Sequence, residues 1–407
     1  MRAHHLSLLG LLACAAPAAA PVRPGIEVLL SDSLHLVAGK RVALLTNQTG
    51  VDRTGRRDVD LLRATAAQLV FLYNPEHGFR GAEDRPDLAD GVDSASGLPI
   101  YNLYGVPRAA ALDRLGGVDA VLVDLQDVGA RYYTYASTGV VLMQAAARLG
   151  KPVIVLDRPN PMGGEVVQGN VRGQPAPVDS FVGILPVPMR HGMTLGELLA
   201  FANDVLGIHA RLTVVPAAGW RRTMYFDETG LRWVPPSPAL PDLESALHYP
   251  GSCLFEGTNL SVGRGTMVPF QVIGAPWMDA EAVIRRVGDE GRGKGAGLDG
   301  VELTSDTVTP RTPTDGKYGG VRTHVVRLRV TDRLAYDPTH TAVALLVALR
   351  ALYPDSLRFL PAKFDQLAAG PGLRAAVLAG QSPRVIWEGW NAALGTFRNR
   401  RGKYLLY

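Results

Sequence analysis

Four short apolar runs in the first half of the chain constrain its fold more than any other feature of the sequence. They are Arg41 to Asn47 (RVALLTN), Leu69 to Asn74 (LVFLYN), Asp119 to Asp127 (DAVLVDLQD) and Pro152 to Asn160 (PVIVLDRPN). Each run has a continuous apolar stretch, which is typical of strands that are covered on both faces. We therefore expect a parallel sheet with helices packed against it.

Helical patterns separate and follow these runs. Residues 131–150 have helical apolar spacing, and Gly150 is a good stop signal. A second helix is expected over residues 57–68. A third begins at Thr194, where Glu197 three residues later completes the spacing of a capping box. This alternation predicts the α/β class, with a doubly wound, mostly parallel sheet.

The pattern changes after about residue 219, where proline-rich and glycine-rich loops become common. Residues 321–330 alternate polar and apolar, as in a half-exposed strand, and residues 337–354 form a clear helical pattern. Strand and helix signals are segregated here, which predicts a smaller α+β domain. The length of 407 residues suits two domains, expected over 26–260 and 261–407.

Residues 1–20 have the features of an export signal. The apolar run from Leu6 to Ala13 is too short to span a membrane, and small residues follow it. Cleavage near Ala18 would release a soluble protein, whereas the LLAC sequence ending at Cys14 resembles a bacterial lipobox and would leave a lipid on that cysteine. Either route predicts an exported protein, periplasmic or extracellular, with membrane attachment only through a lipidated Cys14.

Charge and cysteine content exclude some functions. The net charge is only +4, and no Lys/Arg block marks a nucleic-acid binder, so we expect a small-molecule partner. Once the signal is processed, Cys253 has no partner for an intrachain disulfide, and we expect it to be a buried apolar residue.

Polar side chains gather where the four predicted strands end. Ligands of an open parallel sheet bind beyond the carboxyl ends of its strands. These ends carry, in chain order, Asn47 and Gln48; Glu76 and His77; Asp124, Gln126, Asp127 and Arg131; and Arg158 and Asn160. Turns alone would explain asparagine and aspartate, but not this concentration of Glu, Gln, His and Arg. The sequence therefore predicts a functional site at this edge.

Glu76 is the best candidate for a general acid. It follows a buried strand, where nearby apolar and aromatic groups would favour its protonated form. In the alternative reading it forms an ion pair with Arg80 or Arg131. His77 either assists the acid or binds substrate, unless it is simply a structural histidine, and the same choice applies to His191.

Several familiar site types lack their sequence signals. No Gly-x-Gly-x-x-Gly follows the first strand, and no Gly-x-Ser-x-Gly or His-Glu-x-x-His motif occurs. We therefore expect no cofactor and no dedicated metal site. Asp124 and Asp127 could hold a hard cation, which leaves a metal-dependent hydrolase as an alternative.

Long motifs resemble one bacterial family, the NamZ-type exo-β-N-acetylmuramidases of cell-wall recycling, formerly a domain of unknown function. Among them are LLTNQTGVDRTGRRDVDLL, NPEHGFRG, DLQDVGARYYTYASTG, KPVIVLDRPNPMGG and EGTNLSVGRGTMVPFQVIGAPW. The similarity extends from about Ile26 to the C-terminus. It implies a Rossmann-like domain, a smaller C-terminal domain and an active site in the cleft between them.

The resemblance also implies a reaction, the release of terminal N-acetylmuramic acid from the non-reducing end of peptidoglycan fragments. The glutamate of the family's PEHG motif falls on Glu76. Glycoside hydrolysis needs a second function, which could be Asp127, Asp124, Glu256 or the substrate's own acetamido group. A protein that binds such fragments without turning them over remains an alternative.

The lactyl carboxylate of N-acetylmuramic acid calls for a guanidinium partner. Arg131, Arg158 and Arg264 are the candidates, in that order. Tyr132, Tyr133 and Trp277 could pack on the sugar, and Asn259 in the EGTN segment could bind it.

Overall fold

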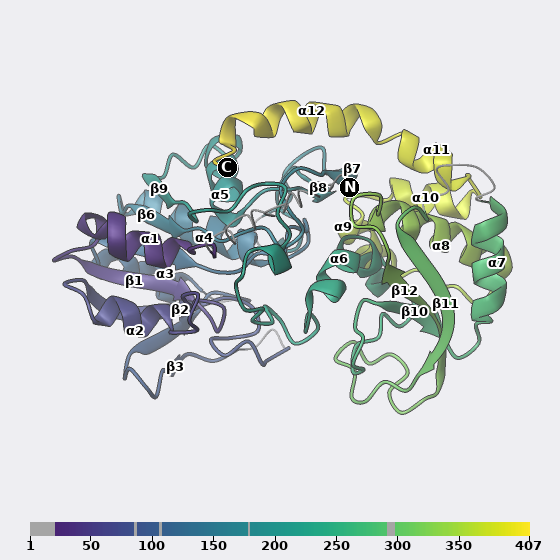
Figure 1. Cartoon of the computed structure of the whole chain (residues 1–407), viewed down its shortest axis with the longest axis horizontal. Helices are drawn as coiled ribbons and strands as arrows, with labels where there is room; N and C mark the ends of the chain where they lie inside the picture. The colour runs from purple at the N-terminus through teal and green to yellow at the C-terminus, as the bar shows by residue number, and fades with distance from the viewer. Residues whose placement is uncertain (1–20, 85–87, 106–107, 178–179, 291–297) are drawn as a thin grey trace, which may run out of the picture.

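The structure is a computed structural model that describes residues 21–84, 88–105, 108–177, 180–290 and 298–407. The export signal and Cys14 therefore lie outside the described residues. Two halves lie side by side, with the first sheet in one and a smaller sheet in the other (Figure 1). No helix in these ranges is both long and apolar enough to cross a membrane.

Within the described ranges, the larger sheet has seven strands in the order β3-β4-β2-β1-β5-β6-β9. All neighbouring pairs are parallel except β3 and β4. The strands are β1 (Arg41–Thr46), β2 (Gln68–Asn74), β3 (Gly91–Val92), β4 (Pro99–Asn102), β5 (Ala120–Asp124), β6 (Val153–Leu156) and β9 (Leu212–Val215). The four predicted strands are thus confirmed as β2, β1, β5 and β6, adjacent in the sheet.

Helices cover both faces of this sheet, as its buried strands require. Leu44 of β1 shares one core with helices α1 (Gly25–Asp32) and α2 (Asp58–Arg63), and Leu45 shares the other with α4 (Tyr135–Arg148) and α5 (Leu195–Val205). Neighbouring residues of a strand point to opposite faces, so one apolar run fills both cores. The doubly wound α/β fold is confirmed.

Two of the predicted helices are confirmed, and the third is shorter than expected. Thr194 and Glu197 form the capping box at the start of α5. Gly150 has a φ of 64°, which suits the turn after α4. Helix α2 ends at Arg63 rather than near residue 68, because β2 already begins at Gln68.

The second half is the predicted α+β unit. An antiparallel sheet in the order β10-β12-β11 packs against helices, and the predicted strand over 321–330 is β12. Its strands are β10 (Val272–Ala275), β11 (Val301–Val308) and β12 (Thr323–Val330). The helices of this half are α7 (Ala280–Glu290), α8 (Pro338–Leu352), α9 (Pro361–Leu367), α10 (Gly372–Leu378), α11 (Pro383–Glu388) and α12 (Asn391–Arg401). We assign α6 (Leu243–Ser252) and the turn that follows it to this half as well, because α6 packs against α8 and β12 although it precedes residue 261.

Short elements complete the chain. They are α3 (Ala109–Asp113), the hairpin of β7 (Gln168–Val171) and β8 (Pro188–Arg190), and the 3₁₀ turns Leu34–Leu36, Arg114–Gly117, Phe226–Glu228, Cys253–Gly257 and Gly402–Tyr404.

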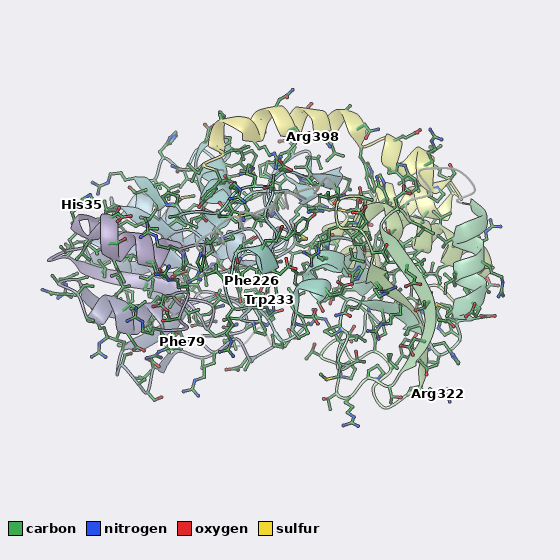
Figure 2. All side chains as sticks on the ribbon, viewed as in Figure 1. His35, Phe79, Phe226, Trp233, Arg322 and Arg398 are labelled. Atoms are coloured by element: carbon green, nitrogen blue, oxygen red, sulfur yellow. The ribbon has the colours of Figure 1, made fainter. Side chains whose placement is uncertain are left out.

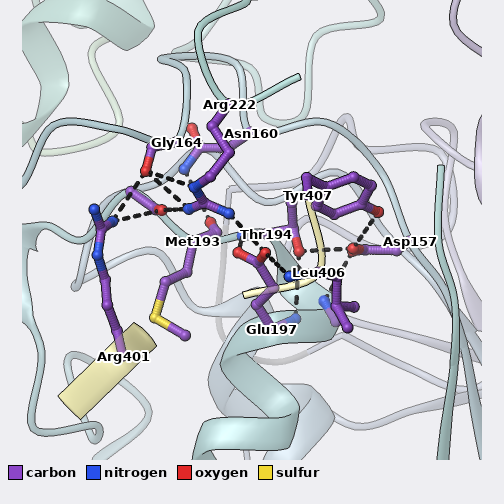
Figure 3. A network of polar contacts seen from close by, with 12 residues as sticks. Asp157, Asn160, Gly164, Met193, Thr194, Glu197, Arg222, Arg401, Leu406 and Tyr407 are labelled. Carbon is purple, nitrogen blue, oxygen red and sulfur yellow. Dashed lines mark hydrogen bonds and ion pairs between the residues drawn. The ribbon is translucent and has the colours of Figure 1, made fainter. Parts of the chain in front are cut away.

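The C-terminal tail ties the second half back onto the first. Helix α12 runs along the top of the molecule and ends near α5 (Figure 1). Arg401 at its end donates to the carbonyls of Gly164 and Gly192 at 3.0 and 2.8 Å. Leu406 N donates to Glu197, and the Tyr407 hydroxyl donates to Asp157 at 2.7 Å (Figure 3). The two halves are therefore held together by buried polar contacts as well as by their shared core.

Candidate active site

A cavity of about 320 Å³ is lined by residues from both halves of the chain. The first half contributes Glu76, His77, Asp84, Tyr104, Tyr132, Tyr133, Thr134, Val182 and Ser237; the second contributes Tyr249, Cys253, Glu256, Arg264, Phe270, Thr314, Asp315, Lys363, Gln366 and Leu367. Six residues predicted from the sequence as site residues are among them: Glu76, His77, Tyr132, Tyr133, Glu256 and Arg264.

The turn after β2 presents Glu76 to this cavity. The strand ends at Asn74, and His77 and Gly78 then have consecutive φ angles of 69° and 75°. Glycine tolerates this left-handed conformation, but a histidine there is held by its surroundings. The His77 ring is buried, and its Nδ1 lies 2.8 Å from the carbonyl oxygen of Glu83. His77 thus fixes the loop whose first residue is Glu76.

The Glu76 carboxylate is surrounded by hydroxyl groups. Thr134, at the start of α4, donates its hydroxyl to Glu76 Oε2 at 2.5 Å. Burial, and then the neighbouring Glu76 carboxylate, raises the pKa of Tyr104. Among the described residues Glu76 has no ion-pair partner. Arg80 instead donates to Ser94, at 3.4 Å. The ion pair considered from the sequence is therefore absent from this part of the chain.

An ion-pair network forms the opposite wall of the cavity. Arg264 donates to Glu256 at 2.5 Å and to Asp84 at 3.0 Å, so it links the second half to the first. Lys363 Nζ lies 3.7 Å from the other oxygen of Glu256. Burial alone would raise the pKa of Glu256, but the charges of Arg264 and Lys363 outweigh burial, and the pKa is lowered. Glu256 is thus an ionised carboxylate held between two cations.

Aromatic rings complete the wall. Tyr249 meets Tyr132 and Phe270 edge to face, with ring centroids 5.7 and 4.8 Å apart. The Arg264 guanidinium lies over the Phe270 ring at 5.2 Å. Cys253 is buried, as predicted, and burial raises the pKa of its thiol. A cavity with ionised groups on one wall and aromatic rings on another suits a polar ligand that has apolar ring faces, such as a sugar.

Two of the three candidate arginines lie outside this cavity. Arg131 is buried and donates to the carbonyls of Asn170 and Leu367, at 2.5 and 2.8 Å, joining the β7 strand to α9. Arg158 forms a buried two-point ion pair with Asp124, at 2.5 and 3.0 Å. Only Arg264 of the three candidates lines the cavity next to Glu76.

Asp127 and His191 face each other in the interior. Asp127 Oδ1 accepts from Gly129 N at 2.7 Å and lies 3.7 Å from His191 Nε2, while Oδ2 has no hydrogen-bond partner within the described residues. Burial raises the pKa of Asp127 to about 7. Burial, with the charge of Arg401 next, lowers the pKa of His191 to about 3. The pair is enclosed and does not line the Glu76 cavity.

The predicted amide residues do not line this cavity, and all but Asn47 donate to backbone carbonyls. Asn47 donates to the Tyr135 hydroxyl at 2.7 Å, and Gln48 to the carbonyl of Pro235 at 2.8 Å. The other three donate to carbonyls too: Gln126 to Asp127 and Pro159, Asn160 to Met193, and Asn259 to Ser356. Trp277 packs against Tyr353.

Sequence reasoning missed Thr134, Tyr104, Asp84 and Lys363 in the cavity wall. Thr134 lies in the RYYTYASTG motif, but its place at the start of a helix gave no sign that its hydroxyl would meet Glu76. Lys363 follows Pro361 at the first turn of α9, about 100 residues after Glu256 and Arg264, and only the tertiary fold brings it next to them.

Comparisons with known proteins cover nearly the whole chain. Family models described as the N-terminal and C-terminal parts of the exo-β-N-acetylmuramidase NamZ match residues 42–244 and 247–407. The peptidoglycan β-N-acetylmuramidase NamZ of Bacillus subtilis strain 168 is 39% identical over 389 residues, which span 95% of this chain and 91% of that protein.

Solved structures agree with the fold. Two DUF1343 family proteins from Bacteroides fragilis, 33% and 30% identical, superpose with TM-scores of 0.83 and 0.73; each match covers 95% of this chain and 99% of the other. These matches span both halves of the chain, including the strand ends and the wall of the cavity. The chain therefore belongs to the exo-β-N-acetylmuramidase NamZ family.

Proposed function

We propose that this chain is a glycosidase that releases terminal N-acetylmuramic acid from the non-reducing end of peptidoglycan fragments, with Glu76 as general acid. One observation carries the proposal. Glu76 lines a cavity between the two halves, its carboxylate is oriented by Thr134, and the cations Arg264 and Lys363 lie in the wall of the same cavity. Family membership supports the reaction class.

Glu76 transfers its proton to the glycosidic oxygen as the bond to the anomeric carbon breaks. In its protonated form the carboxyl group is a donor, and the charge that develops on the sugar is of the oxocarbenium type. Thr134 fixes the rotamer of the acid, and the hydroxyl groups around it keep the carboxylate hydrogen-bonded after the proton has left. Because the acid is already oriented toward the glycosidic oxygen, less free energy is spent on orientation in the transition state, and the activation barrier of the hydrolysis is lower.

Arg264 and Lys363 bind the lactyl carboxylate in this proposal. Arg264 uses Nε and Nη1 on Glu256 and Asp84, which leaves Nη2 without a partner among the described residues. The Lys363 side chain is 46% exposed, so its ammonium group can turn toward a ligand. A sugar that lacks the lactyl group would make neither of these two contacts, which gives selectivity for muramides.

Asp84, Glu256 and Asp315 are the carboxylates that line the cavity besides Glu76, and we propose that the second function of the reaction is among them or is the substrate's acetamido group. Glu256 is ion-paired with Arg264 and Lys363, so it is suited to the role of a carboxylate that stays negatively charged. Asp315 has a buried Oδ2 with no hydrogen-bond partner in the described residues. Asp124 and Asp127, the earlier candidates, lie outside this cavity.

The purified protein tests the activity directly. We expect release of the chromophore from a 4-nitrophenyl muramide, and free N-acetylmuramic acid from a muramyl-glucosamine disaccharide by mass spectrometry. The matching glucosaminide is expected to be a poor substrate. Binding of the disaccharide without release of either product would instead indicate a sugar-binding protein.

The proposed location is outside the cytoplasm, since residues 1–20 carry export features. Mass spectrometry of the mature protein distinguishes the two processing routes. A lipid on Cys14 and a free N-terminus near residue 19 are the two outcomes, and an unprocessed Met1 in the secreting host would contradict export.

A further inference from the structure

A second cavity, of about 230 Å³, lies at the carboxyl edge of the larger sheet, apart from the Glu76 cavity. Its lining residues are Thr49, Val51, Asp52, Gly55, Gln126, Arg158, Phe226, Leu231, Arg232, Trp233 and Val234. None of them lines the first cavity. Three of them, Thr49, Gln126 and Arg158, follow strands β1, β5 and β6.

This position is the topological switch point of the sheet. The chain leaves β1 for β2 on one side, and later leaves β5 for β6 on the other, while β1 and β5 are neighbours. The loops after β1 and β5 therefore diverge and leave a crevice between them, which is where open α/β sheets bind ligands. Glu76, which follows β2, lies one strand further along the edge.

Two polar side chains that line this cavity each keep one atom that makes no hydrogen bond within the described residues. Arg158 is 6% exposed; its Nε and Nη2 contact Asp124 and the carbonyl of Val51, and its Nη1 makes no hydrogen bond to another described residue. Gln126, also 6% exposed, uses its Nε2 on two carbonyls and leaves Oε1 similarly free. Neither atom is fully enclosed, so a donor and an acceptor at this position are open to a ligand or to water.

Aromatic rings and one uncompensated charge define the rest of the wall. Phe226 and Trp233 meet at 86° with ring centroids 5.0 Å apart, and both labels lie near the middle of the molecule (Figure 2). The Asp52 carboxylate is paired with Arg56 at 2.8 Å. Arg232 is exposed at the rim and has no ion-pair partner in the described part of the chain. The cavity thus has aromatic rings in one wall and a net positive charge at its rim.

We propose that this cavity binds a monosaccharide that carries a carboxylate, and that its occupant is free N-acetylmuramic acid. The sugar face packs on Trp233, the carboxylate meets Arg158 Nη1 and Arg232, and a hydroxyl or amide N–H donates to Gln126 Oε1. The choice of sugar acid rests on the proposed function, because it is the product released there. A volume below that of most drug-sized pockets suits a single sugar ring.

The loop from Leu231 to Ser237 connects the two sites. Trp233 and Val234 line the second cavity, and Ser237 lines the first. Between them, the carbonyl of Pro235 accepts from Gln48 at 2.8 Å and that of Pro236 from Tyr135 at 2.5 Å. A sugar acid against Trp233 therefore contacts the same loop that borders the Glu76 cavity.

Calorimetric titration with N-acetylmuramic acid tests the proposal. It compares wild type with Arg232→Glu, Trp233→Leu and Lys363→Glu, with N-acetylglucosamine and lactate as partial ligands. Arg322→Glu is the matched control, because Arg322 is an exposed arginine that lines neither cavity and lies well away from Phe226 and Trp233 (Figure 2). Far-UV circular dichroism verifies that each variant is folded.

We expect two binding events in wild type. Arg232→Glu weakens one of them about tenfold, because like charges now meet, and Lys363→Glu weakens only the other. Trp233→Leu affects the same event as Arg232→Glu, and the partial ligands bind it more weakly. A single event that is insensitive to Arg232→Glu and Trp233→Leu would overturn the proposal. Binding that depends on Arg232 in a protein that releases no sugar would contradict only the proposed hydrolysis.

Discussion

At the scale of single residues, the sequence could point to Glu76 and Arg264 but not to their surroundings. The polar residues at the strand ends predicted an edge rich in acids and guanidinium groups, and the acid does line a cavity there. Arg131 was expected at the same edge, yet its guanidinium is bound by backbone carbonyls. The sequence does not show which polar side chains form hydrogen bonds within the fold, because their partners lie in loops that are distant along the chain.

Thr134→Val tests how the acid is positioned. The variant keeps the shape of the side chain but removes the hydroxyl that donates to Glu76. A hydrogen bond to an ionisable group is worth roughly 1.5–3 kcal/mol, so we expect kcat/KM to fall about tenfold or more. Thr138→Val, one turn along α4, is the control. Equal activity of the two variants would mean that Thr134 does not orient Glu76.

Asp127 makes stability depend on pH. Its pKa in the folded protein is about 7, against an ordinary 3.8, so the folded state holds the proton more tightly. This contribution is full below about pH 3.8 and is lost as the pH rises through 7. Asp127→Asn keeps Oδ1 for Gly129 but cannot ionise.

We therefore expect Asp127→Asn to raise Tm relative to wild type at pH 8.5, by an amount that shrinks as the pH falls toward 5.5. The difference in unfolding free energy between the two pH values is on the order of 2 kcal/mol. Thermal unfolding of both proteins across this range measures it. A difference independent of pH would mean that Asp127 is ionised throughout.

At the scale of elements, the apolar runs predicted the strands well because a buried parallel strand leaves little freedom in its composition. The short strands β3 and β7 lack such a run and were not expected. The end of α2 was also misplaced, since β2 competes for the same residues. The C-terminal tail could not be predicted at all, because its partners lie some 200 residues earlier in the chain.

Tyr407→Phe tests the tail. The hydroxyl donates to buried Asp157 and accepts from Ala217 N at 2.8 Å. Its removal leaves two polar groups short of a partner, so we expect a loss of about 1–2 kcal/mol in unfolding free energy by urea denaturation. Tyr404→Phe, whose hydroxyl meets exposed Asp204, is the control and should leave the midpoint unchanged. Equal effects of both changes would show that the tail does not stabilise the first half through Asp157.

At the scale of the whole molecule, the two halves contribute different parts of the candidate site. The acid Glu76 comes from the larger sheet, and the cations Arg264 and Lys363 come from the smaller domain. Arg264 also bridges the halves through Asp84. The sequence predicted two domains and an acid at the edge of the larger sheet, but the mutual placement of the domains depends on packing between distant segments and has no local signal.

Lys363→Ala tests whether the smaller domain supplies the contact to the lactyl carboxylate. Because Lys363 is half exposed, its removal disturbs the fold less than loss of Arg264, which holds Glu256 and Asp84. We expect kcat/KM to fall about fivefold for a muramide and to change little for the glucosaminide, since only the muramide has a carboxylate to bind. The exposed Lys403→Ala serves as control. A uniform loss on both substrates would place the carboxylate contact elsewhere.

The most direct test of the central claim is the release of N-acetylmuramic acid from a muramyl-glucosamine disaccharide by Glu76→Gln. The amide is nearly isosteric and accepts from Thr134, so the variant should fold and bind the disaccharide as wild type does. It has no acidic proton to give, and we expect kcat to fall by at least about 100-fold while the Kd for the disaccharide stays within a few-fold. Turnover at the wild-type rate in a folded Glu76→Gln protein would contradict the assignment of Glu76 as the general acid.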